Sequence, residues 1–205
     1  LSFLTLSIIP LKSDAPAKKK VVYGDASQFF MTQGSLYIVS NYWKQGTGDS
    51  TCPPNACCIM PVFRSEQNAL IHRFSTQKDT VKYEYSVLTP GMPLSQYALN
   101  EKNGVLFTAN QKDWMTNGVD IFAIDATGKL LSKLENVGAK ERFQAARYIG
   151  DRLYLVTFEQ VDPLFVIDTK DTKNMTILGE LKMPGYSTYL HPYDATHLIG
   201  IGFDT

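Results

Sequence analysis

The side chains best suited to chemistry stand near the end of the sequence: His191, Tyr193, Asp194 and Asp204. An imidazole with carboxylates can ligate a hard cation such as Ca²⁺ or act as an acid–base group. This functional interpretation places His191, Asp194 and Asp204 near one end of the fold. In the competing interpretation, aspartates make turns by bonding their own backbone, and His191 anchors a loop. We take the four as candidate binding residues and assign no catalytic residue.

Three cysteines, Cys52, Cys57 and Cys58, lie close together in residues 51–58. A disulfide from Cys52 to Cys57 or Cys58 would staple a loop that buries little, and it would leave one odd thiol. A structural zinc site with His72 as fourth ligand is the alternative, and free thiols are the third interpretation. We favour the disulfide and assign no metal site. Because disulfides persist in oxidising compartments, this choice points outside the cytoplasm.

No familiar reaction signature is present. The sequence shows no Ser-His-Asp order, no nucleophile elbow and no glycine-rich phosphate loop. Its 20 basic and 20 acidic residues balance, whereas nucleic-acid binding needs a basic face; the lysine run at 18–20 is better explained as a solvated strand end. No window approaches the ~20 apolar residues of a transmembrane helix. We therefore expect neither a nucleic-acid partner nor a membrane span in this sequence.

A leucine-rich run recurs along the chain. Leu106, Leu153 and Leu198 occupy the same place in three such runs, 47 and 45 residues apart (106 to 153, 153 to 198). That period matches a β-propeller blade of four strands and roughly 40–50 residues. An earlier copy at Leu36 precedes Leu106 by 70 residues (36 to 106). The first unit therefore carries an insertion, which we place in residues 44–61, around the cysteines.

Each unit repeats one order of strands. We expect opening strands at 28–31, 96–99, 144–148 and 187–190, second strands at 35–40, 105–109, 153–157 and 197–201, third strands at 69–74, 119–125 and 163–168, and closing strands such as 81–85 and 177–182. The second and third strands are continuously apolar, as strands covered on both faces should be, whereas the closing strands alternate. No stretch has a helical period. We predict an all-β fold of four-stranded antiparallel propeller blades.

The same order divides the whole sequence into blades. Residues 1–24 would end one blade, 25–91, 92–140 and 141–185 would form three more, and 186–205 would begin the next. Residues 1–10 lack the basic leader and cleavage site of a signal peptide and are predicted to form a strand. The two partial units could combine into one composite blade, but we favour a portion of a larger ring. Unpaired blade edges would invite self-association.

Residues 146–158, with 160–168 and 185–194, carry a resemblance to a known family. These runs closely resemble the secreted β-propeller-domain proteins of bacteria and archaea, distant relatives of WD-type propellers. The resemblance covers most of the chain and is specific from Arg142 onward; the cysteine-bearing loop departs from it. It implies an extracytoplasmic propeller, extracellular or in the cell envelope and longer than this sequence, and it carries over no catalytic residue.

Three functions fit these observations. The first is a non-catalytic binding or scaffolding propeller at the cell surface that displays loops such as 44–61 to a protein or glycan partner, since rigid scaffolds carry recognition on their loops. The second is a hydrolase that works at the mouth of the central channel, with Ca²⁺ held by Asp and backbone oxygens. The third is a structural component of a surface assembly. We favour the first, and we expect no cofactor other than this calcium alternative.

Overall fold

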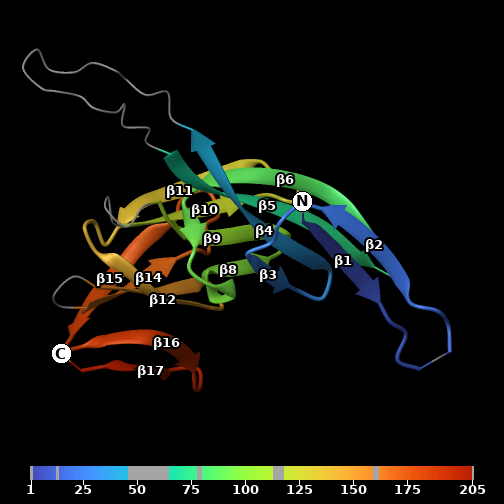
Figure 1. The fold of residues 1–205 in the computed structure, drawn as a ribbon. Helices are drawn as coiled ribbons and strands as arrows, with labels where there is room; N and C mark the ends of the chain where they lie inside the picture. The colour runs from blue at the N-terminus through green and yellow to red at the C-terminus, as the bar shows by residue number, and fades with distance from the viewer. Residues whose placement is uncertain are drawn as a thin grey trace, which may run out of the picture.

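The protein is almost entirely β-strand. The computed structural model describes residues 2–12, 14–45, 65–77, 80–112, 118–158 and 162–204. Within these ranges the one helical element is a single 3₁₀ turn, η1 (Gln96–Ala98). All strand pairs within the sheets are antiparallel, and along the chain a four-stranded, a five-stranded and a second four-stranded sheet follow one another (Figure 1). The predicted all-β fold of four-stranded blades is confirmed.

Three sheets have the form of a blade. The first blade pairs its strands in the order β3 (Gln28–Met31), β4 (Ser35–Gln45), β5 (Ser65–Gln77) and β6 (Thr80–Pro90). The second blade contains β7 (Met92–Pro93), β8 (Leu99–Lys102), β9 (Val105–Gln111), β10 (Val119–Ile124) and β11 (Leu130–Val137). The third blade pairs β12 (Arg142–Ile149), β13 (Arg152–Phe158), β14 (Asp162–Asp168) and β15 (Thr176–Met183) in chain order.

The inner strand of the second blade is interrupted. The sequence predicted a strand at 96–99, and this prediction is wrong, because η1 occupies Gln96–Ala98. The Ser95 hydroxyl accepts a hydrogen bond from the Tyr97 amide at 3.3 Å, and such local side-chain bonds compete with a sheet ladder. The inner strand is therefore made of two pieces, β7 and β8, which both pair with β9.

A separate hairpin lies at each end of the arc of blades. The N-terminal hairpin pairs β1 (Phe3–Ile8) with β2 (Lys18–Tyr23), and the C-terminal hairpin pairs β16 (Tyr186–Pro192) with β17 (Leu198–Phe203). Figure 1 shows β1 and β2 beyond the first blade and β16 and β17 beyond the third. The two hairpins stay separate sheets within the described residues, so no composite blade forms.

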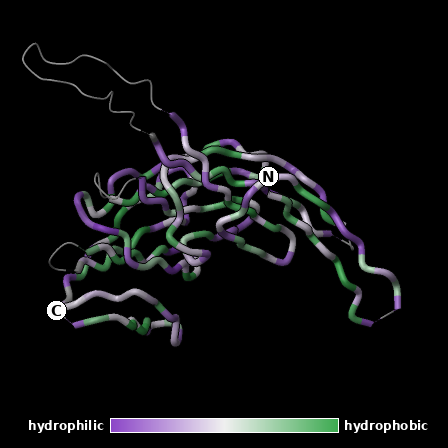
Figure 2. Tube along the Cα trace, viewed as in Figure 1, coloured by the Kyte–Doolittle hydropathy of each residue, from purple (hydrophilic) through white to green (hydrophobic). Residues whose placement is uncertain are grey.

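Apolar side chains fill the spaces between successive blades. The first and second blades share a core that includes Val39, Ile71, Leu106 and Phe122. The second and third blades share a larger one: Ala98, Phe107, Ala109, Val119, Ile121, Ala123, Val137, Phe143, Ala146, Leu153, Leu155, Phe165, Ile167 and Met175. Figure 2 shows the hydrophobic residues concentrated along the strands and the hydrophilic ones at the turns. Burial on both faces explains the continuous apolar runs of the central strands.

Contacts between blades define two rims of the arc. On the first, the Gly91 amide donates to the Gln67 carbonyl at 2.9 Å, and the rings of Phe158 and Tyr186 lie 4.7 Å apart. We call it the insertion rim, because β4 ends and β5 begins there, on either side of residues 46–64.

The second rim carries the short turns between first and second strands, and we call it the turn rim. There the Thr32 hydroxyl donates to Glu101 at 2.7 Å, and Lys102 pairs with Asp151. Glu101 also forms an ion pair with Arg73 at 3.3 Å. Since Thr32 and Arg73 belong to the first blade and Asp151 to the third, the second blade is held by polar contacts on both sides.

A substitution at Gly128 tests how tightly the first two blades are packed against each other. Gly128 has a φ of +88°, and a Cβ there would lie 2.7 Å from the Cδ2 of Tyr85 in the first blade. We expect Gly128→Ala to lower the free energy of unfolding by about 2–4 kcal/mol, from backbone strain together with overpacking. Guanidinium unfolding measures this loss.

Gly104→Ala is the matched control. Gly104 has a similar φ of +77°, but the nearest atom to its added Cβ is the Cβ of Ala126 at 3.7 Å. Gly104→Ala should lower the free energy of unfolding by about 1 kcal/mol, through the backbone conformation alone. Equal losses in the two variants would contradict tight packing of Tyr85 on Gly128.

Candidate functional site

Asp194 organises the turn between β16 and β17. Its Oδ1 accepts hydrogen bonds from the backbone amides of Thr196 and His197, both at 2.7 Å, and its carboxylate lies 2.8 Å from the His197 Nδ1. These hydrogen bonds hold the pKa of Asp194 below its ordinary value, and the bond from the Thr196 amide has the largest effect. Its carboxylate oxygens are thus occupied by the turn's own donors, as the structural interpretation of the sequence expected.

His191 and Tyr193 lie beside this turn, on the turn rim. The His191 Nδ1 is 3.1 Å from the hydroxyl of Tyr189 on the same strand. Tyr193 is 70% exposed, and its amide donates to the His197 carbonyl at 3.1 Å. The structure therefore brings three of the four candidate residues together around one hairpin turn.

Asp204 lies at the opposite rim. Phe203 pairs with Tyr186, whereas Leu198 pairs with Pro192 beside the turn, so the hairpin's length of roughly 20 Å separates Asp204 from His191. The expectation that His191, Asp194 and Asp204 share one end of the fold is wrong. An antiparallel hairpin places residues at its turn and residues at its open end on opposite rims.

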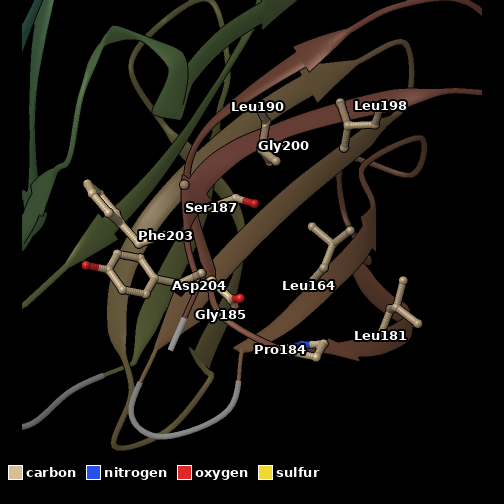
Figure 3. Close-up of a pocket in the computed structure, with 12 residues that line it drawn as sticks. Leu164, Leu181, Pro184, Gly185, Ser187, Leu190, Leu198, Gly200, Phe203 and Asp204 are labelled. Atoms are coloured by element: carbon tan, nitrogen blue, oxygen red, sulfur yellow. The ribbon is translucent and has the colours of Figure 1, made fainter.

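Asp204 instead lines an open cavity of about 450 Å³ between the third blade and the C-terminal hairpin. Figure 3 shows Leu164 and Leu181 on one side of this cavity and Leu190, Leu198 and Phe203 on strands β16 and β17. Among the described residues, Asp204 is the one charged residue that lines the cavity, and most of the others are apolar. This part of the lining therefore offers apolar packing.

The disulfide and its alternatives stay predictions, because Cys52, Cys57 and Cys58 lie outside the described residues. The same holds for all but the first two residues of the insertion placed at 44–61; Lys44 and Gln45 end β4. His72, the suggested fourth zinc ligand, lies on β5 opposite Ile38 and Ser86. Within the described ranges, no three His, Cys, Asp or Glu residues are grouped to hold a metal ion.

A row of aromatic and cationic side chains runs along the inner elements of the second blade, the third blade and the C-terminal hairpin. The guanidinium of Arg147 on β12 stacks over the ring of Tyr97 in η1, 4.5 Å from its centroid. Tyr97 in turn meets Tyr189 on β16 edge-to-face, with centroids 5.6 Å apart. Tyr189 continues to His191 through the hydroxyl contact described above. We call these four residues the inner row.

The inner row is accessible. Tyr97 is 37% exposed, His191 is exposed, and Arg147 and Tyr189 are half-buried. Inner strands line the central channel of a closed propeller, so the row lies where a ligand in the channel would pass. Tyrosine and arginine supply broad contact surface, hydrogen-bond donors and charge, the residue types that dominate binding sites. The arrangement suits recognition.

Sequence reasoning singled out His191 as a candidate binding residue but missed Tyr97 and Tyr189. The available signal was the repeat itself, since both tyrosines fall in the opening segments of their units, at 96–99 and 187–190. Aligning opening segments as well as the leucine-rich runs would have placed an aromatic residue on two inner elements on either side of Arg147. Their contact with Arg147 needed the structure.

The strand order, the burial between blades and the inner elements define a propeller-class repeat protein. The family model for the β-propeller domain matches residues 1–205. The chain belongs to this family.

Two archaeal proteins are similar in sequence. An uncharacterized protein of Methanocaldococcus jannaschii is 44% identical over 120 residues, which are 56% of this chain and 19% of that protein. An uncharacterized protein of Archaeoglobus fulgidus is 37% identical over 139 residues, 68% of this chain and 22% of that protein. The chain thus spans about a fifth of the length of these relatives.

Among solved structures, a europium-containing methanol dehydrogenase is similar with a TM-score of 0.46 at 16% identity, covering 77% of this chain and 24% of that one. In the described part of the chain, no helix has the length and apolar character needed to cross a membrane.

The partial burial of His72 predicts how the stability of the protein depends on pH. Desolvation lowers the pKa of its imidazole below the ordinary value of 6.5. As the pH falls, the unfolded chain therefore takes up a proton at His72 at a higher pH than the folded chain does. Protonation thus favours the unfolded chain, and the free energy of unfolding falls as the pH drops through 6.5. We expect His72→Gln to make stability less dependent on pH between 7 and 5 in urea unfolding. NMR titration of the His72 ring at or above pH 6.5 would contradict this assignment.

Proposed function

We propose that this chain is part of a non-catalytic propeller that acts outside the cytoplasm, as a binding or scaffolding module for a protein or glycan at the cell surface. The observation that carries this proposal is the inner row, an accessible set of aromatic and cationic side chains contributed by two blades and the C-terminal hairpin. Its members come from separate sheets, and each sheet is held by packing between blades. A rigid scaffold that presents such groups is suited to recognition.

A further observation favours binding over catalysis. Asp194, the carboxylate nearest to His191 in sequence, accepts hydrogen bonds from its own turn. The extracytoplasmic location is supported by the three neighbouring cysteines, because stapled loops belong to oxidising compartments.

The proposal predicts saturable binding to the cell envelope without turnover. The protein, expressed as its full natural chain, would be mixed with envelopes prepared from its source organism and sedimented, with the free fraction measured across concentrations. Portions of the envelopes would first be treated with protease or with periodate, so that loss of binding identifies a protein or a glycan partner.

Protease treatment of intact cells supplies the location control. An extracytoplasmic protein should be cleaved in intact cells, whereas a cytoplasmic marker stays whole. Absence of saturable binding, or protection of the protein in intact cells, would overturn the proposal.

A further inference from the structure

Arg147 has the surroundings of an anion receptor. Its guanidinium forms no ion pair with any residue in the described ranges. It is half-buried on β12, and its guanidinium lies over the ring of Tyr97. A guanidinium has five N–H donors in a fork that matches a carboxylate, and contact with a ring does not use these donors up. A half-buried guanidinium with no ion pair in the described ranges is therefore suited to pair with an anionic ligand.

The residues beside Arg147 indicate which other groups a fitting ligand carries. Tyr97 and Tyr189 present aromatic rings that carry hydroxyl groups, so each offers an apolar surface with a polar tip. The Tyr189 hydroxyl and the His191 imidazole, 3.1 Å apart, can both donate and accept hydrogen bonds. A fitting ligand therefore combines a carboxylate with an apolar ring face and several hydroxyl groups.

We infer that the inner row binds a uronic acid residue of an acidic glycan. The carboxylate of the sugar lies against the edge of Arg147, the C–H face of its ring lies on the tyrosines, and its hydroxyls bond Tyr189 and His191. An acidic peptide fits less well, because it lacks a ring with several hydroxyl groups that could meet Tyr189 and His191. This inference rests on the proposed binding function and names the chemistry of its partner.

Calorimetric titration with tetragalacturonate tests the inference. The protein, again as its full natural chain, should bind this probe, and Arg147→Ala should weaken the affinity about 10- to 100-fold, the loss expected for a charge-assisted bidentate contact. Arg147→Lys should recover only part of the loss, because lysine lacks the planar fork. Tyr97→Ala should also weaken binding, since the guanidinium loses its platform.

Arg142→Ala is the matched control, because Arg142 is exposed at the other end of the same strand. Removing this charge should change the affinity less than about twofold, as expected for a distant surface charge. Circular dichroism melting of each variant shows whether it is folded. Equal weakening by Arg142→Ala and Arg147→Ala would mean nonspecific charge attraction and would overturn the inference.

Two further probes test whether binding requires the carboxylate and whether it requires a sugar. A neutral tetrasaccharide should bind at least about tenfold more weakly than tetragalacturonate. Tetraglutamate binding as tight as tetragalacturonate would overturn the glycan assignment in favour of an acidic peptide. If wild-type protein binds envelopes but not tetragalacturonate, or if Arg147→Ala leaves envelope binding unchanged, the inference fails while the proposed function stands. If envelopes are not bound at all, the proposed function itself fails.

Discussion

Each blade has two apolar faces, and a single sheet of four strands cannot cover either of them. Ile121 and Leu155, on neighbouring blades, are fully buried only because the second and third sheets pack face to face. Burial of large aliphatic side chains contributes about 1.5–3 kcal/mol each. This mutual covering is the constraint on which the rest of the structure depends, and it makes stability a property of neighbouring blades, as in other repeat proteins.

Face-to-face packing also aligns the inner elements. Once the second and third blades are stacked and β16 lies against β12, the elements η1, β12 and β16 lie next to one another. Arg147, Tyr97 and Tyr189 can then meet although each comes from a different sheet. The inner row is therefore a product of packing between blades, and a change that separates blades would disperse it.

Polar contacts add specificity to this packing. Arg73 bonds Glu101 and the carbonyl of Ala126, both in the second blade. Lys102 then pairs with Asp151 of the third. Buried or half-buried pairs of this kind contribute little net stability, because desolvation offsets their attraction. Their directional bonds can instead select one alignment of successive blades, so that the turns meet on one rim.

Period and polarity in the sequence determined the strands, their order within a blade and the all-β class. These are local properties: continuous apolar runs require cover on both faces, and the opening strand predicted at 28–31 is β3 itself. The strand predicted at 96–99 is replaced by η1, where the Ser95 hydroxyl accepts a local hydrogen bond from the Tyr97 amide. Only the tertiary structure decided that Asp204 lies on the rim opposite His191, and that Tyr97 lies under Arg147. Such positions depend on strand pairing and on packing between sheets, which join residues far apart in the chain.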